Sequence, residues 1–181
     1  MSPEERHRCM AAIKGKNTKP EMMVRRYLHA LGLRYGLHNS RLPGKPDIVL
    51  RRLKTVVFVN GCFWHGHDGC KHFRMPKGDS SPYWVQKITR NKERDLQNIA
   101  KLESLGWKVI VVWECELKNK EQRLARLYAL GRQLLEIRDG AVPEYIPPDF
   151  PDESPTVTPA AYMHPSDDEL PLAAEPDPTY K

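Results

Sequence analysis

Three short runs rich in β-branched residues, separated by helical patterns, most constrain the fold of this chain. The runs cover residues 47–50, 55–60 and 108–113, and most of their residues are large and apolar. Such runs favour strands that are buried on both faces, because a strand with one solvated face alternates apolar and polar residues. No stretch approaches the roughly 20 apolar residues that a membrane-spanning helix needs.

Amphipathic patterns surround these runs. Thr18 is placed to cap a helix, with Glu21 three residues later completing a capping box, and Gly32 is placed to end that helix. The order helix, strands, helix, strand, helix predicts an α/β protein with a central mixed sheet flanked by helices. Beyond the three runs, the spacing predicts helices over residues 18–31, 83–105 and 117–137 and a short strand over residues 34–37.

The charge of the chain changes sign near residue 138. Residues 1–138 carry 28 Lys and Arg against 13 Asp and Glu, whereas residues 139–181 carry ten acidic residues and one basic residue. A body with a net charge of +15 predicts a polyanionic partner, with nucleic acid as the default and plain solvated surface as the alternative. The second segment also holds ten of the 16 prolines, which favours a disordered acidic tail over residues 139–181.

Three cysteines of the basic body lie close to a group of histidines. Without a secretion signal, disulfides are a poor interpretation of these cysteines. A tetrahedral zinc site needs four Cys or His ligands. Cys62, His67 and Cys70 supply three from one loop, and Cys115 supplies the fourth from beyond a strand, with His72 as the main rival. Four protein ligands close the coordination shell, so the site is predicted to be structural.

A second candidate site combines Asp47 with His65. Asp47 begins one β-branched run, and the next run ends at Asn60, shortly before His65. If these two strands pair as a hairpin, Asp47 and His65 face the same cleft. A histidine on a metal-rigidified loop suits acid–base chemistry. The alternative for Asp47 is a turn residue that follows Pro46.

These motifs in this order resemble the very short patch repair endonucleases, which nick DNA beside thymine in T:G mismatches left by deamination of 5-methylcytosine. The resemblance covers about residues 6–137, so the acidic tail is outside it. The motifs that carry it are Pro-Gly-Lys-Pro-Asp47, Val-Asn-Gly-Cys62-Phe-Trp-His65, Glu93-Arg-Asp95 and Leu105-Gly-Trp-Lys-Val-Ile-Val-Val-Trp113-Glu-Cys115.

The resemblance implies a restriction-endonuclease-like fold, with Mg²⁺ at Asp47 and His65 as the general base that activates water. It places Glu21 where a carboxylate orients metal-bound water, which competes with the capping role, and Asp95 where it orients His65. Asn60 stands where the family often has His, and an amide cannot act as an acid or a base. The implied structural Zn²⁺ ligands are Cys62, His67, Cys70 and Cys115.

The resemblance also implies how DNA is read. It assigns Phe63, Trp64 and Trp84 to intercalation beside the T:G pair, where a mismatched step is cheaper to open; the alternative for these residues is core packing. Helical spacing places a polar face on the predicted long helix, ready for phosphates or base edges. The residues of that face are Lys87, Arg90, Asn91 and Arg94, and a basic N-terminal arm adds Arg6, Arg8, Lys14, Lys16 and Lys19.

The leading interpretation is therefore a Mg²⁺-dependent, strand-nicking mismatch endonuclease, with double-stranded DNA that carries a T:G mismatch as its partner and repair proteins downstream. One alternative is a non-catalytic, zinc-stabilised DNA-binding module. Another is a related restriction or homing nuclease that cuts matched duplex. The first residues have neither a basic flank nor an apolar core, so we expect a cytoplasmic, nucleoid-associated bacterial protein, and we expect it to be a monomer.

Overall fold

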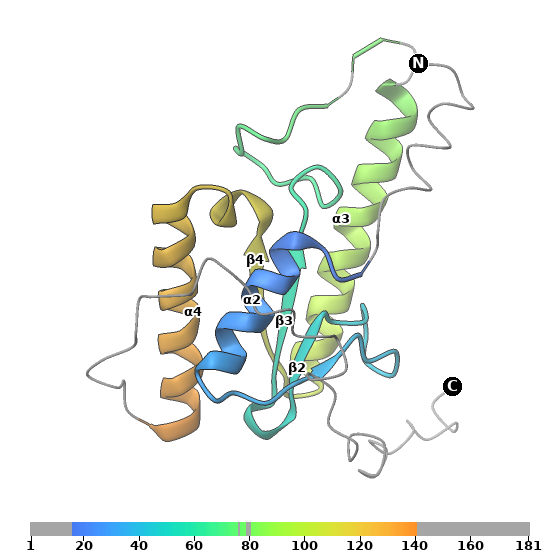
Figure 1. Cartoon of the computed structure of the whole chain (residues 1–181). Helices are drawn as coiled ribbons and strands as arrows, with labels where there is room; N and C mark the ends of the chain where they lie inside the picture. Colours follow the sequence, from blue (N-terminus) through green and yellow to red (C-terminus); the bar gives the residue numbers. More distant parts are fainter. Residues whose placement is uncertain (1–15, 76, 79–80, 141–181) are drawn as a thin grey trace, which may run out of the picture.

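A computed structural model of the chain describes residues 16–75, 77–78 and 81–140. Of the predicted basic arm, only Lys16 and Lys19 lie within these residues, and Lys19 begins a helix. Of the predicted tail over residues 139–181, only Asp139, which ends a helix, and Gly140 lie within them. Figure 1 shows the elements around a central sheet. In chain order they are α2 (Lys19–Ala30), β1 (Gly36–Leu37), β2 (Ile48–Leu50), the 3₁₀ turn η1 (Arg51–Leu53), β3 (Thr55–Asn60), α3 (Ser81–Ser104), β4 (Lys108–Trp113), the 3₁₀ turn η2 (Glu114–Leu117) and α4 (Lys120–Asp139).

The sheet is mixed, as predicted, with the strand order β1-β2-β3-β4. β2 and β3 form the expected antiparallel hairpin, in which Ile48 pairs with Val57, and the left-handed φ of +47° at Lys54 helps to close the turn. β3 and β4 are parallel. Because a parallel pair needs a long connection, α3 crosses over between them. The hairpin brings Asp47 beside β3, and the loop that follows β3 carries His65.

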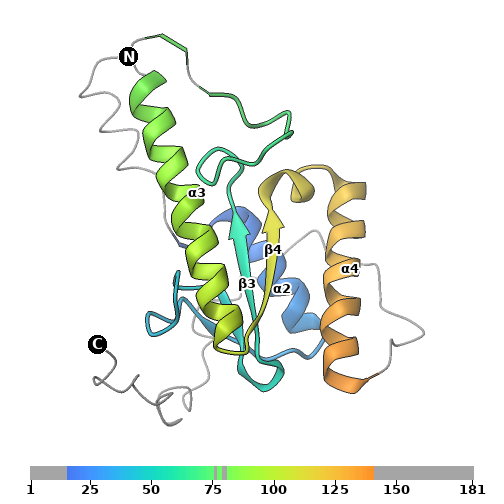
Figure 2. The ribbon, with the colours of Figure 1, turned by 180° about the vertical axis from the view of Figure 1, so that it is seen from behind.

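Helices cover both faces of the sheet. Side chains of β3 alternate between two cores: Val57 packs with α2 and α4, whereas Val56 packs with Leu102 of α3. Figure 2 shows α3 on the face of the sheet opposite α2 and α4. This burial on both faces explains why the strands read as nearly continuous apolar runs. None of the described helices is long and apolar enough to cross a membrane.

The largest differences from the predicted boundaries are at the first strand and at the start of the last helix. Of the expected strand over residues 34–37, only Gly36–Leu37 pairs with β2. The last helix begins at Lys120 rather than at Leu117, because the Asn119 side chain accepts hydrogen bonds from two backbone N–H groups of the first turn and caps it there. Residues Glu114–Leu117 form the separate turn η2, which places Cys115 directly after β4.

Candidate active site

Asp47 lies at the mouth of the β2–β3 hairpin and faces β3. Its Oδ2 accepts a hydrogen bond of 2.7 Å from the backbone N–H of Val59. Its Oδ1 lies 3.8 Å from Nδ1 of His38, which follows β1. Asp47 is thus held across the hairpin, and the simple turn role is not sufficient to describe it.

Burial is the largest influence on Asp47 and raises the pKa of its carboxyl above the usual value. The Val59 N–H lowers this pKa, the nearby Glu21 carboxylate raises it, and the imidazoles of His38 and His65 lower it. An ionised Asp47 therefore needs additional positive charge at this site. A divalent cation supplies such charge, and carboxylate oxygens are its usual ligands.

Glu21 reaches the same site from the first turn of α2 and is only 2% exposed. Thr18 caps the helix, and its Oγ1 accepts from the backbone N–H of Glu21 at 3.4 Å. The Glu21 side chain instead contacts Arg25, with Oε1 at 3.2 Å from Nη1, and His38, with Oε1 at 3.1 Å from Nε2. The carboxylate is therefore directed towards Asp47, and only the Thr18 half of the predicted capping box is present.

Glu21, His38 and Asp47 together form a candidate cation site, which we call the Glu-His-Asp cluster. One potential ligand atom from each residue lies within 4.8 Å of the others. Nε2 of His38 is buried and has no hydrogen-bond partner among the described residues. Two carboxylates and a buried, unpaired ring nitrogen fit a divalent cation, which supports the predicted metal position at Asp47 and adds His38, which the sequence did not single out.

His65 and Asp95 form a second pair beside this cluster. Nδ1 of His65 lies 2.5 Å from Oδ2 of Asp95, which projects from the middle of α3. An ionised carboxylate can only accept, so Nδ1–H donates this hydrogen bond to Asp95. In the neutral ring, Nε2 then keeps its lone pair. Arg94 Nη2 contacts the other oxygen of Asp95 at 3.3 Å. His65 also lowers the pKa of Asp47, as a nearby imidazole does, and a cleft shared by Asp47 and His65 stays a prediction.

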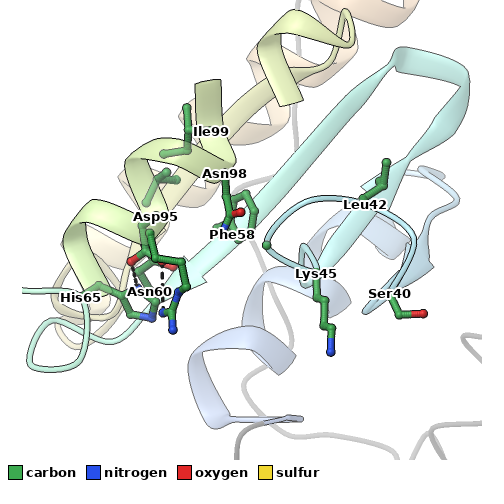
Figure 3. A pocket seen from close by; sticks show the side chains of 12 residues that line it. Ser40, Leu42, Lys45, Phe58, Asn60, His65, Asp95, Asn98 and Ile99 are labelled. Atoms are coloured by element: carbon green, nitrogen blue, oxygen red, sulfur yellow. Dashed lines mark hydrogen bonds and ion pairs between the residues drawn. The ribbon is translucent and has the colours of Figure 1, made fainter. Parts of the chain in front are cut away.

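An open cavity of about 480 Å³ lies beside this pair, between α3 and the loop that precedes β2. Figure 3 shows His65 and Asp95 at one end of it, with Lys45 on the facing loop and Asn98 on α3. Asn60, at the end of β3, also lines the cavity. Lys45 and Arg94 give the walls positive charge, which suits the phosphates of a nucleic acid.

The four predicted zinc ligands meet in a second cluster, which we call the Cys3His cluster. Nδ1 of His67 lies 3.6 Å from Sγ of Cys62 and 3.4 Å from Sγ of Cys115, and Cys70 completes the group. Ligands on a tetrahedral zinc ion at the usual bond lengths lie about 3.6 Å apart, so the spacing fits Zn²⁺. The rival His72 contributes its backbone N–H to Sγ of Cys70, and its ring is not part of the cluster.

Without a cation, two thiols of the Cys3His cluster favour the protonated form. Burial raises the pKa of Cys62, and burial together with the thiols of Cys62 and Cys70 raises that of Cys115 to about 12. A bound zinc ion reverses this effect, because it stabilises the thiolate form. Stacking of His67 on Trp113, with ring centroids 4.0 Å apart, further fixes the ring.

The loop of the Cys3His cluster is also packed against α3. Gly66 has a left-handed φ of +58°, and a Cβ at this position would lie 2.8 Å from Cγ2 of Ile88. Only glycine permits this close approach, which holds the loop carrying His65 against the helix carrying Asp95. Asn91 ties the same loop to α3 by donating from Nδ2 to the backbone oxygen of Trp64 at 2.9 Å.

The three predicted wedge residues form one aromatic group at the start of α3. Ring centroids of Phe63 and Trp84 are 5.1 Å apart, and those of Phe63 and Trp64 are 5.2 Å apart. Trp84 is 8% exposed, so in the free protein it packs within this group, while Phe63 and Trp64 are half-buried. Lys87 lies over the rings of Trp64 and Trp84 at 5.9 and 5.8 Å, which joins positive charge to the aromatic surface.

The predicted polar face of α3 is divided between structural and exposed roles. Arg90 and Arg94 are exposed, and Arg94 also contacts Asp95, whereas Asn91 is hydrogen-bonded to the backbone of Trp64. The sequence analysis did not identify His38 or the cavity residues Lys45 and Asn98 as part of the site. The one sequence signal for His38 was its place directly after the predicted short strand over residues 34–37.

Replacing Asp47 by asparagine is expected to stabilise the cation-free protein near neutral pH. Because the pKa of Asp47 is raised in the fold, its favourable contribution exists at low pH and is lost as the pH rises through that pKa. Thermal unfolding of zinc-loaded protein, free of other divalent cations, should show a higher midpoint for Asp47→Asn, with the difference vanishing in acid. Added Mg²⁺ should stabilise only the wild type.

The matched control for this comparison is Glu103→Gln, since Glu103 is an exposed acidic residue near the end of α3. Its unfolding midpoint should follow that of the wild type at each pH and Mg²⁺ concentration. An Asp47→Asn protein that is less stable than the wild type at neutral pH, or that is still stabilised by Mg²⁺, would contradict the expectation.

Comparison with known proteins gives a matching family model and several similar proteins. Residues 1–72 match the family model described as DNA mismatch endonuclease Vsr. The chain is 51% identical over 125 residues to the type II nicking enzyme V.NmeAIP of Neisseria meningitidis, covering 69% of this chain and 88% of the relative. It is 47% identical over 127 residues to V.XorIIP of Xanthomonas oryzae, covering 70% and 92%. It is 38% identical over 117 residues to the DNA mismatch endonuclease Vsr of Escherichia coli, covering 65% and 74%.

Proposed function

Because the chain belongs to the Vsr family of DNA strand-nicking endonucleases, we propose that it is a Mg²⁺-dependent enzyme that nicks one strand 5′ of thymine in T:G mismatches. These mismatches arise by deamination of 5-methylcytosine, and the nick begins very short patch repair, in which downstream repair proteins follow. The substrate is chromosomal duplex DNA, so the site of action is the bacterial nucleoid. We propose that the enzyme works as a monomer.

The observation that carries this proposal is the placement of the Glu-His-Asp cluster beside the His65–Asp95 pair. Nε2 of His65, left as an acceptor by Asp95, takes a proton from the attacking water. The water oxygen bonds to phosphorus as the bond to the leaving deoxyribose oxygen breaks, and that oxygen is protonated by solvent. Asp47 and Glu21 would hold the cation. When bound, Mg²⁺ supplies positive charge that stabilises the developing charge on the phosphate.

Charge and aromatic surface support DNA as the substrate. Lys45 and Arg94 line the cavity next to His65, where they are placed to receive the phosphates that flank the scissile bond. The aromatic group of Phe63, Trp64 and Trp84 offers a wedge for a base step, with Lys87 over its rings. Opening a mismatched step costs less than opening a matched one, so the wedge favours T:G sites.

The zinc position has a structural part in this proposal. The Cys3His cluster holds the loop that carries His65, Phe63 and Trp64. We propose that Zn²⁺ fills it with four protein ligands and leaves no open position for chemistry. The cation site and the zinc site are therefore separate in location and in role.

The proposal is tested by a nicking assay on labelled duplexes that differ only in T:G or T:A at one position. Zinc-loaded enzyme with Mg²⁺ is expected to nick the T:G duplex on the thymine strand, and Asp47→Ala is expected to bind that duplex without cutting it. Equal cutting of T:G and T:A duplexes would favour a nuclease for matched DNA. Binding to T:G without any nicking by the wild type would favour a binding module.

A further inference from the structure

His38 belongs to none of the sequence motifs, yet its backbone and side-chain contacts hold it beside Asp47. It directly follows β1, and its backbone N–H donates to the backbone oxygen of Asp47 at 3.3 Å. Its φ of +44° lies in the left-handed region, which residues other than glycine adopt infrequently, although His, Asn and Asp are enriched there. The antiparallel pairing of β1 with β2, in which Leu37 pairs with Ile48, therefore sets His38 beside Asp47.

Both ring nitrogens of His38 face carboxylates. Nε2 lies 3.1 Å from Oε1 of Glu21, and Nδ1 lies 3.8 Å from Oδ1 of Asp47. Nε2 is buried and makes no hydrogen bond with any described residue, in spite of the short distance to Glu21. A neutral imidazole has one N–H and one lone pair, so between two carboxylates one lone pair must face another. A cation bound at Nε2 removes the conflict with Glu21, and Asp47 is close enough to share that cation, since one ligand atom from each of the three residues lies within 4.8 Å of the others.

We propose that His38 is a direct ligand of the divalent cation that Glu21 and Asp47 hold, so that one imidazole nitrogen joins two carboxylates in the site. This inference rests on the proposed function, because it concerns the cation of the same reaction. Ligands at a right angle around a cation at about 2.1 Å lie about 3 Å apart, which is close to the separation of Glu21 Oε1 and His38 Nε2. Arg25, bound to Glu21, balances part of the carboxylate charge.

A nitrogen ligand changes which cations the site prefers. Sites built of oxygen ligands suit Mg²⁺, whereas imidazole suits first-row transition ions. The Glu-His-Asp cluster should therefore bind Mn²⁺ and Co²⁺ more tightly than Mg²⁺, in the general order of affinity of these ions. His38 thereby becomes the residue that sets the metal preference of the enzyme.

The test is Mn²⁺ binding to the zinc-loaded full-length protein without DNA, followed by electron paramagnetic resonance, with Mg²⁺ as competitor. His38→Gln is expected to weaken Mn²⁺ binding by about tenfold or more, and to weaken Mg²⁺ binding less. Electron spin echo spectra of the bound Mn²⁺ should show coupling to a directly bound nitrogen in the wild type, and that coupling should vanish in His38→Gln. Zinc content and circular dichroism verify that each variant is folded.

Two controls assign the result to His38. His29→Gln replaces an exposed histidine at the far end of α2 and should leave both affinities and the nitrogen coupling unchanged. His65→Gln should retain the nitrogen coupling, because His65 is paired with Asp95. Loss of the coupling in His65→Gln but not in His38→Gln would overturn the proposal.

Other outcomes also separate this inference from its premise. Equal weakening of Mn²⁺ and Mg²⁺ in His38→Gln, without nitrogen coupling in the wild type, would make His38 a positioning residue and overturn the proposal alone. Asp47→Asn is expected to remove the binding of both ions. If Asp47→Asn still bound Mn²⁺ with wild-type affinity, the cation site would lie elsewhere in the protein. The proposed function would then also lose its main support, the cation site beside His65.

Discussion

The variant His65→Gln is expected to nick T:G duplex about 10²- to 10⁴-fold more slowly than the wild type, with little change in its affinity for that duplex. Glutamine keeps the size and polarity of the side chain, but it offers no group that takes a proton from water. The rate should be measured in single turnover at saturating enzyme, so that product release does not hide the chemical step. Binding should be measured with Ca²⁺ in place of Mg²⁺.

Asp95→Asn tests the same His65–Asp95 pair from the side of the carboxylate. Its amide can donate to Nδ1 of His65, which would place the ring proton on Nε2 and remove the acceptor that faces the water. A similar loss of rate is expected. His29→Gln serves as the matched control and should nick normally, since His29 is exposed on α2. Wild-type nicking by His65→Gln would remove His65 from the mechanism.

Cys115→Ser is expected to lose bound zinc, to unfold at a markedly lower temperature and to lose nicking activity. Structural zinc sites contribute about 10–16 kcal/mol of apparent binding energy in zinc-finger peptides, so even a fraction of this value is large compared with the stability of a small domain. The loop of the Cys3His cluster carries both His65 and the aromatic wedge, which explains why activity falls with stability. Metal analysis and thermal unfolding measure the two effects.

His72→Ala is the matched control for zinc, because the ring of His72 lies outside the Cys3His cluster. It should keep one zinc ion for each chain and unfold close to the wild type. Trp113 fluorescence adds a local signal, since the indole stacks on His67. Retention of zinc by Cys115→Ser, together with its loss from His72→Ala, would reassign the fourth ligand.

Patterns within single segments were sufficient to predict most of the fold. The apolar runs predicted β2, β3 and β4 because these strands are buried on both faces, and helical spacing predicted α2 and α3. The composition of the Cys3His cluster was also predictable, since sulfur and imidazole ligands gather on one loop and on Cys115. The start of α4 was missed because the apolar pattern extends back to Leu117, whereas the Asn119 cap makes the helix begin at Lys120.

The parts of the site that the sequence did not reveal depend on contacts between distant segments. His38 meets Glu21 only because β1 pairs with β2 while α2 packs beneath them. Glu21 itself has two plausible roles in the sequence, and only the position of His38 and Arg25 shows where its carboxylate points. Asn91 was expected to face DNA, yet it hydrogen-bonds the backbone of Trp64.

One long helix joins the two tasks of the proposed enzyme. α3 runs from Ser81 to Ser104, with Trp84 near its first turn and Asp95 eleven positions later, which is about 16 Å along a helix axis. The length of α3 therefore sets the distance between the base step that the wedge opens and the phosphodiester bond that is cut. A one-residue insertion between Trp84 and Asp95 would turn one end of the helix by about 100° relative to the other. The position of the nick relative to the mismatch thus depends on the number of residues in this part of α3.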